Sequence, residues 1–218
     1  MPKPSSLARD ARDVDTEQRI LDAAHAVFLR RGTAGARMQE IAEEAGVNKA
    51  LLHYYFRSKS RLAEAVFQRV ARLLFPAVIE VLASDADIET KVQRVVAHEL
   101  DHLSQSPFAP AYVISELTLQ PERVRQFIRA TIGLDVDGIG PRILARLQRQ
   151  IDERARAGTM RRIAAEQFVV NLLALCIFPF AARPLLQAVL RLDERGFARF
   201  INQRKKELPA FFLAALRP

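Results

Sequence analysis

The sequence contains little that would indicate a secreted or membrane-embedded protein. Its 218 residues include one cysteine, Cys176, which excludes an internal disulfide and agrees with a reducing cytoplasm. The longest apolar run, residues 168–180, is interrupted by Asn171 and is shorter than the roughly 20 residues that a membrane span needs. Residues 1–14 have no apolar segment of the kind found in secretory signals. We therefore expect a soluble, cytoplasmic protein with no membrane partner.

Strand patterns are missing as well. Nearly every segment places apolar residues at helical spacing, which predicts an all-α fold. We expect a flexible arm over residues 1–14, an N-terminal head over 15–62 and a larger helical domain over 63–218. The first helix is predicted to start near Asp15 or Thr16 and to stop at Gly32. Further helices are predicted at 38–45, 49–56, 59–81 with a bend at Pro76, 88–105, 108–119, 121–130, 136–157, 164–178, 182–192 and 194–215, with Pro179 as one of the breaks.

The net charge of +8 suggests a polyanionic partner without locating it, since both the head and the rest of the chain carry a positive excess. Residues 38–56 are more informative, because a short amphipathic helix, a turn with Gly46 and a second helix make a helix-turn-helix pattern. Leu52 and Phe56 can bury one side of the second helix. The opposite side carries Lys49, Ala50, His53 and Tyr54, with Tyr55 beside them.

Between Gly46 and Ala63 the sequence has four Lys or Arg and no Asp or Glu. Such a surface suits contact with DNA phosphates and base edges, although a merely solvated basic turn remains the alternative. Lys59 stands in the first turn of the next helix, where a cation opposes the helix dipole. We expect Lys59 to lie over a phosphate at that helix N-terminus.

At residues 16–67 the segments TEQRILDAAHAVFLRRG and MQEIAEEAGVNKALLHYYFRSKSRL resemble the DNA-binding domain of TetR-family transcriptional regulators. The resemblance implies a ligand-responsive homodimer, most often a repressor, that binds a pseudo-palindromic operator and is released by a small effector. It differs from the common pattern in having Arg37 near the start of the second helix, Leu51, and His53 in place of an aromatic ring. The DNA-binding residues that we predict are Arg37, Gln39, Asn48, Lys49, Ala50, Leu51, His53, Tyr54, Tyr55 and Lys59.

Residues 98–102, HELDH, match the zinc-protease motif H-E-x-x-H, which keeps a metal-dependent hydrolase using His98, Glu99 and His102 as an alternative. A catalytic zinc needs a third protein ligand, and no histidine follows His102, so that only Glu116 or Glu122 could serve. Glu99 moreover falls inside the apolar stripe of its helix. We therefore expect no metal, no cofactor and no enzyme. A non-specific nucleic-acid-binding protein is the other alternative.

In this family the C-terminal helices commonly surround an effector cavity. Glu99 is expected either to pair with an Arg in the core or to face that cavity and recognise a cationic or hydroxyl-bearing ligand. The predicted cavity residues are Phe67, Phe75, Glu99, His102, Phe108, Tyr112, Glu116 and Cys176. Helices 164–178 and 194–215 carry more apolar surface than a monomer can cover, which indicates a dimer interface. The predicted interface residues are Phe168, Leu172, Leu175, Phe197, Phe200, Ile201, Phe211 and Phe212.

Overall fold

The computed structural model describes residues 6–74, 76–119 and 139–218. Within these ranges the protein consists of helices without strands, as the spacing of apolar residues predicted. The predicted helix at 121–130 lies outside the described residues. The helices are α1 (Ser6–Gly35), α2 (Met38–Ala45), α3 (Lys49–Phe56), α4 (Lys59–Leu74), α5 (Pro76–Ala83), α6 (Ile88–Gln105), α7 (Ala109–Leu119), α9 (Ile139–Arg156), α10 (Ala165–Ala181), α11 (Arg183–Val189) and α12 (Glu194–Ala214).

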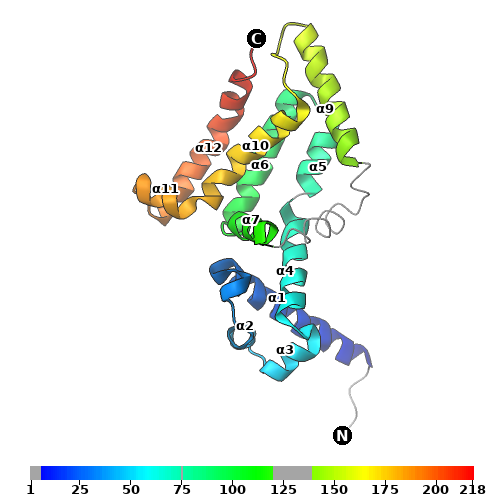
Figure 1. Cartoon of the computed structure of the whole chain (residues 1–218), viewed down its shortest axis with the longest axis vertical. Coiled ribbons are helices and arrows are strands. Elements are labelled where there is room, and N and C mark those ends of the chain that lie inside the picture. The colour runs from blue at the N-terminus through cyan, green and yellow to red at the C-terminus, as the bar shows by residue number, and fades with distance from the viewer. Residues whose placement is uncertain (1–5, 75, 120–138) are drawn as a thin grey trace.

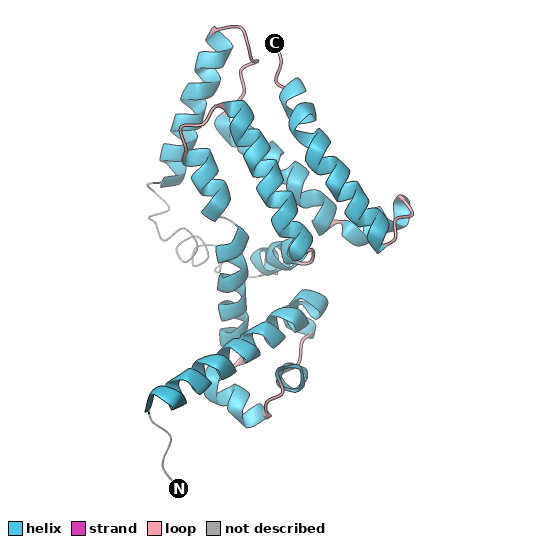
Figure 2. Ribbon diagram, turned by 180° about the vertical axis from the view of Figure 1, so that it is seen from behind, coloured by secondary structure: helices cyan, strands magenta, loops and turns pink. Residues whose placement is uncertain are grey.

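The molecule has two parts joined by α4. The N-terminal head consists of α1, α2, α3 and the start of α4, and the remaining helices form a larger C-terminal domain (Figure 1). Figure 2 shows the same two parts from behind, with α3 at the end of the head that faces away from the C-terminal domain. The side chains at the centre of the head are fully or almost fully buried, because each helix turns one apolar stripe inward. They are Ile20, Ala24, Val27, Phe28, Ile41, Leu52, Phe56 and Leu62.

The first helix begins earlier than predicted. α1 starts at Ser6 and passes through Asp15 and Thr16, so these residues do not cap it. After Pro4 the sequence LARDARDV contains neither proline nor glycine, and Leu, Ala and Arg favour helix, so nothing stops an earlier start. The break at Gly32 is confirmed: this residue has φ 68° and ψ 163°, which is not helical. That conformation suits glycine, since it has no Cβ.

The start of the C-terminal domain follows the prediction closely. The Ser58 hydroxyl accepts from the backbone N–H of Arg61 and caps α4. α4 ends at Leu74 and α5 begins at Pro76, as expected from the missing N–H of proline. The helix predicted at 88–105 has these bounds in α6, with the Asp87 side chain accepting from Thr90 N–H at 2.7 Å.

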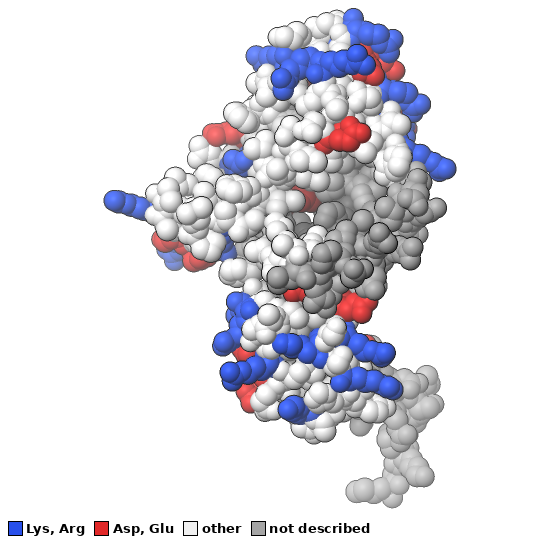
Figure 3. All heavy atoms as spheres, viewed as in Figure 1, with Lys and Arg blue, Asp and Glu red and all other residues white. Residues whose placement is uncertain are grey.

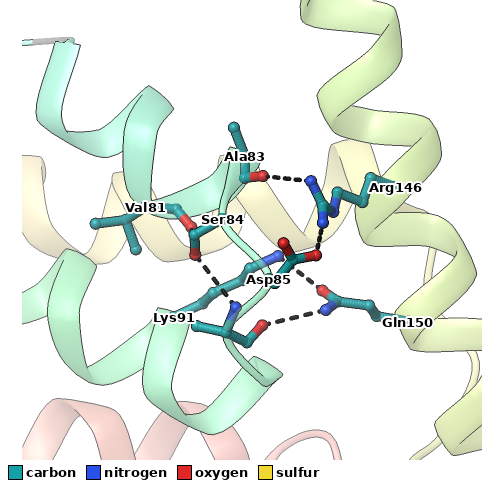
Figure 4. Close-up of polar contacts among 8 residues, drawn as sticks. Val81, Ala83, Ser84, Asp85, Lys91, Arg146 and Gln150 are labelled. Carbon is teal, nitrogen blue, oxygen red and sulfur yellow. Dashed lines mark hydrogen bonds and ion pairs between the residues drawn. The ribbon is translucent and has the colours of Figure 1, made fainter.

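α6 is the central helix of the C-terminal domain, with α5, α10 and α12 packed around it (Figure 1). α9 is held against the corner between α5 and α6 by side chains that reach backbone carbonyls (Figure 4). Arg146 donates to Ala83 O at 2.9 Å and also pairs with Asp85. Gln150 donates to Ala86 O at 3.1 Å and accepts from the buried Lys91 Nζ at 2.7 Å. Burial lowers the pKa of Lys91, which donates to this neutral amide.

Pro179 does not end its helix, contrary to the prediction. α10 continues to Ala181 with Pro179 inside it. A proline removes the N–H that would bond the carbonyl four residues earlier, here that of Leu175. Arg204 of α12 supplies the missing donors, since its Nε and Nη2 atoms reach Leu175 O at 3.1 and 2.9 Å. A hydrogen bond between two helices thus replaces one within a helix.

Tyr112 of α7 joins the two parts of the molecule. Its ring stacks on that of Phe28 in α1, with centroids 6.5 Å apart and planes 3° from parallel. The ring of Phe67 in α4 meets the same tyrosine edge-on at 6.5 Å. A movement of α7 would therefore act directly on α1 and α4 through these ring contacts.

Among the described residues, no single helix is long and apolar enough to cross a membrane. α10 and α11 reach the required length and composition only when taken together, as a pair bent by 71°.

Candidate nucleic-acid interface

The turn between α2 and α3 is defined by hydrogen bonds at both helix ends. Gly46 has φ 65° and ψ 34°, the left-handed conformation that ends α2. The N–H of Gly46 bonds Glu43 O at 3.1 Å and the N–H of Val47 bonds Ala42 O at 2.9 Å, which together form a Schellman motif. The Asn48 side chain then accepts from Leu51 N–H at 2.7 Å and caps α3. The direction of α3 is therefore set by local sequence.

Two basic side chains tie this turn to its neighbours. Arg19 of α1 donates to Ala45 O at 2.7 Å, which covers the carbonyl end of α2. Lys59 at the start of α4 donates to Ala34 O at 3.2 Å, near the end of α1, and to Ala36 O at 3.1 Å, in the connection before α2. Lys59 was predicted to lie over a phosphate. An ammonium group has three donors, so one remains for that contact, but the two carbonyl bonds give Lys59 a positioning role that the sequence did not reveal.

α3 presents two different faces. Leu52 and Phe56 are buried in the head, as predicted. The opposite face exposes Lys49, Ala50 and His53, and Tyr54 is 75% exposed. This large exposed aromatic ring is held edge-on against Tyr55, with centroids 5.3 Å apart. Such a face can offer hydroxyl, amine and ring contacts to a polar partner.

The remaining predicted DNA-binding residues lie around this face. Arg37 is exposed and immediately precedes α2, without capping it. Gln39 is exposed, but its amide donates to Glu43 at 2.8 Å, so it is partly engaged within α2. Leu51 and Tyr55 are half-buried. His53 Nδ1 lies 3.2 Å from Arg57 O and can donate a hydrogen bond to it.

The charged side chains around α3 are more informative about a partner than the net charge of the whole chain. Figure 3 shows Lys and Arg side chains spread over the head and a second group at the opposite end of the molecule. The net charge alone therefore does not locate a partner. At α3 and the start of α4, Lys49, Arg57 and Arg61 are exposed in a stretch of sequence without carboxylates.

A second potential site is a cavity of about 150 Å³ in the C-terminal domain. It lies where α5, α6, α7 and α10 meet. Its wall is aliphatic apart from Glu99, which is 3% exposed and has one carboxyl oxygen, Oε1, without a hydrogen-bond partner in the described structure. Burial raises the pKa of Glu99 to about 7. The residues that border the cavity are Val78, Glu99, Leu103, Pro110, Val113, Ile114, Leu117, Leu173 and Ile177.

Of the residues predicted to line an effector cavity, Glu99 alone borders this one. Phe75 lies outside the described residues. Phe67 and Tyr112 instead pack between the head and α7, because their helices turn the rings toward α1. Phe108 is half exposed beneath the Arg183 guanidinium, which lies 5.4 Å from its ring centre.

The other three predicted cavity residues have different surroundings. Glu116 and Cys176 are buried but do not border the cavity, and burial raises the pKa of the Cys176 thiol to about 12, so this thiol stays neutral. His102 is half-buried, and burial together with the neighbouring His98 lowers its pKa. The actual walls are ordinary Val, Leu, Ile and Pro side chains, which carry no signal in sequence.

Most of the residues predicted to form the dimer interface are buried within the single chain. Five of its residues are at most 4% exposed in the single chain, because they pack between α10, α12 and α6; the rings of Phe168 and Phe212, for example, meet edge-on at 5.1 Å. These five are Phe168, Leu172, Phe197, Ile201 and Phe212. Leu175, Phe200 and Phe211 instead border a groove of about 380 Å³ between α10 and α12.

Large apolar side chains do remain on the outside of these two helices. Phe211 is 65% exposed, and Val170 and Phe178 on α10 are 60% and 56% exposed. We call these three residues, together with Leu175 and Phe200, the outer surface of α10 and α12. Large apolar side chains exposed to solvent are typical of a binding surface.

The HELDH motif does not form a metal site in the described part of the chain. His98 and His102 stack with ring centroids 6.0 Å apart and planes 6° from parallel. No group of three or more metal-binding side chains occurs among the described residues. Glu99, the general base that the motif would require, borders the apolar cavity instead.

Of the two carboxylates that could complete the site, Glu122 lies outside the described residues, and no third ligand joins the histidines within them. We expect the protein purified without added metal to contain far less than one zinc ion per chain, because two stacked imidazoles alone bind zinc weakly. The double variant His98→Ala/His102→Ala should show the same metal content by elemental analysis and the same DNA binding. Stoichiometric zinc in the parent chain that the double variant loses would contradict this expectation.

Comparison with known proteins agrees with the geometry of the head. Residues 20–66 match the family model described as bacterial regulatory proteins, tetR family. The HTH-type transcriptional repressor SCO4008 of Streptomyces coelicolor is 37% identical over 93 residues, which are 42% of this chain and 47% of that protein. The chain thus spans about half the length of this relative. The uncharacterised HTH-type transcriptional regulator TtgW of Pseudomonas putida is 34% identical over 94 residues, which cover 42% of this chain and 67% of that protein.

The fold of the whole chain is similar to that of a solved structure. The ketosteroid transcriptional regulator KstR2 of Mycobacterium tuberculosis superposes with a TM-score of 0.64, covering 93% of this chain and 95% of that one at 14% identity. At this identity the likeness shows the fold alone. With the helix-turn-helix head and its matches in sequence, the chain belongs to the TetR family of bacterial regulatory proteins.

Proposed function

We propose that the protein is a cytoplasmic transcriptional regulator that binds operator DNA as a homodimer. The observation that carries this proposal is the exposed, carboxylate-free face of α3 at the outer end of the head. A helix of this kind fits the major groove, where Lys and Tyr tips reach base edges while nearby cations contact phosphates. Two heads in a symmetric dimer would read two half-sites of a pseudo-palindromic operator.

The homodimer is supported by the outer surface of α10 and α12. A monomer would leave these aromatic and aliphatic groups in water, whereas a second copy could cover them with the same surface, related by a two-fold axis. The matched relative SCO4008 is described as a repressor, and we propose repression as the mode of action of this chain as well.

Release by a small effector is supported by the position of the cavity. α7 borders the cavity with Val113 and Ile114 and contacts the head with Tyr112. A ligand that favours one position of α7 would favour one position of α1, and with it one separation of the two heads in the dimer. Such a shift between two populated states is sufficient to change operator affinity.

The proposal is tested by salt titrations of binding to the DNA upstream of the protein's own gene and to a scrambled duplex. Tyr54→Ala and Lys49→Ala should reduce the preference for the upstream DNA, by about 1–3 kcal/mol for each lost base contact. Lys59→Ala should weaken binding to both duplexes alike, because Lys59 positions the head and at most contacts a phosphate. Arg149→Ala, an exposed cation on α9 far from the head, is the control that should change neither.

Equal losses on both duplexes for Tyr54→Ala and Lys49→Ala would remove base recognition from this face of α3. A parent protein without any preference between the duplexes would instead indicate a non-specific nucleic-acid-binding protein.

A further inference from the structure

The cavity in the C-terminal domain combines features that are costly unless a ligand is present. In the part of its wall that the structure describes, eight aliphatic residues surround one ionisable group, the carboxyl of Glu99. Glu99 is 97% removed from solvent, and its Oε1 atom has no hydrogen-bond partner among the described residues. A buried carboxyl oxygen without a partner is destabilising, because it has given up its bonds to water. Within the described structure, Glu99 Oε1 therefore lacks a partner that would offset the cost of its burial.

The described helices around the cavity do not supply a cation for Glu99. Arg204 of α12 borders the groove beside α10, and its guanidinium donates to the Leu175 carbonyl. Lys205 on the same helix pairs with Asp101 at the exposed side of α6, at 2.5 Å. Arg183 pairs with Glu194 and lies 4.8 Å from the ring centre of Phe197. The pairing of Glu99 with a core arginine, one of the two expectations from sequence, is therefore not found among the described residues.

The remaining ionisable groups near Glu99 do not change this conclusion. Cys176 of α10 is kept as a neutral thiol by burial. His102 of α6 has a pKa lowered by burial and by the neighbouring His98, so its ring favours the neutral form at neutral pH. Glu116 of α7 is buried and would add a further negative charge rather than a positive one. None of these three groups supplies a positive charge to Glu99.

The volume limits the size of that ligand. An aliphatic cavity of about 150 Å³ admits a molecule of the size of one aromatic ring. Val113, Ile114 and Leu173 offer only dispersion contacts, so the body of the ligand must be hydrocarbon. In the described part of the wall the one ionisable group is the Glu99 carboxyl, where an ammonium group would form a short charge-assisted hydrogen bond.

We propose that this cavity binds a small lipophilic amine, with the hydrocarbon part against the aliphatic wall and the ammonium group on the Glu99 carboxylate. The binding site is inferred from the geometry of the cavity alone. Its regulatory meaning rests on the proposed function, because the amine would act as the effector by changing the position of α7.

Benzylamine and benzyl alcohol are suitable probes, since they share a ring of the right size and differ in charge. Calorimetric titration of the full-length protein near neutral pH should show benzylamine binding at least about tenfold more tightly than benzyl alcohol. Glu99→Gln keeps the shape of the side chain and removes its charge, so it should weaken benzylamine binding by about tenfold or more and leave benzyl alcohol nearly unchanged. Asp101→Asn, which removes a carboxylate from the exposed side of the same helix, is the matched control and should bind benzylamine as the parent does.

A second variant tests the location independently of charge. Val113→Phe should fill the cavity and abolish binding of both probes while Glu99 is still present. Benzylamine binding that is unchanged in Glu99→Gln, or probe binding that persists in Val113→Phe, would overturn the proposal.

The same variants separate this proposal from the proposed function. Benzylamine should lower operator affinity in the parent and in Asp101→Asn but not in Glu99→Gln. If the protein prefers its operator but does not bind benzylamine, the amine site is wrong and the regulator remains. If it binds benzylamine through Glu99 but has no operator preference, the amine site is supported and the proposed function fails.

Discussion

Phe211→Asp should convert the dimer into a folded monomer, whereas Phe212→Asp should unfold the chain. Phe211 is 65% exposed on the outer surface of α10 and α12, so an aspartate there is solvated in the single subunit and buried without a partner only in a dimer. Phe212 is 4% exposed and packs against Phe168, so an aspartate there introduces a buried charge into the subunit itself. Burying an uncompensated charge costs several kcal/mol, about 3–5 in typical cases.

Sedimentation velocity and circular dichroism distinguish the two outcomes. The first variant should sediment as a monomer with the helical signal of the parent, and the second should lose helical signal or aggregate. Leu185→Asp is a control on α11, where the side chain is 60% exposed but lies outside the proposed interface, and it should leave the dimer intact. A stable dimer in Phe211→Asp and also in Phe178→Asp would show that the subunits meet elsewhere.

Glu99→Gln should stabilise the protein increasingly as the pH rises. The pKa of Glu99 is raised by burial from 4.5 to about 7, so the folded protein holds this proton more tightly than the unfolded chain does. The resulting stability is fully present below the unfolded pKa and is lost as the pH rises through the folded one. Because each pKa unit corresponds to about 1.4 kcal/mol, the total loss approaches about 3 kcal/mol above neutral pH.

Urea unfolding of the parent and of Glu99→Gln at pH 5 and pH 8 tests this linkage. The difference in unfolding free energy between the two proteins should be about 2.5 kcal/mol larger at pH 8 than at pH 5. Parallel pH dependences of the parent and Glu99→Gln would mean that Glu99 titrates normally in the folded protein.

The head was predictable because its architecture depends on local signals. Gly46 and Asn48 each determine one helix end through bonds within a few residues, and Leu52 and Phe56 are one turn apart on the buried side of α3. The apolar stripe that placed Glu99 inside the core was equally local, since α6 has the predicted bounds and Glu99 is buried.

The C-terminal domain was less predictable for a physical reason. α10 is apolar on nearly all sides and α12 on much of its length, so periodicity cannot show which side faces α6 and which faces outward. Phe211 and Phe212 are neighbours in sequence with opposite environments. The cavity is assembled from four helices and lined by common aliphatic residues, so its position depends on tertiary packing. The carbonyl bonds of Lys59 and Arg204 likewise join segments that are distant in sequence.

The bond from Arg204 to the Leu175 carbonyl also determines how α10 and α12 can move. Pro179 leaves this carbonyl without a donor inside its own helix, so sliding of α12 along α10 would break both contacts at 2.9 and 3.1 Å and leave a carbonyl unpaired. Rotation of the two helices together breaks neither. α10 and α12 should therefore act as one rigid body, and a ligand between α7 and α10 would shift α7 and the head against this body rather than change the body itself.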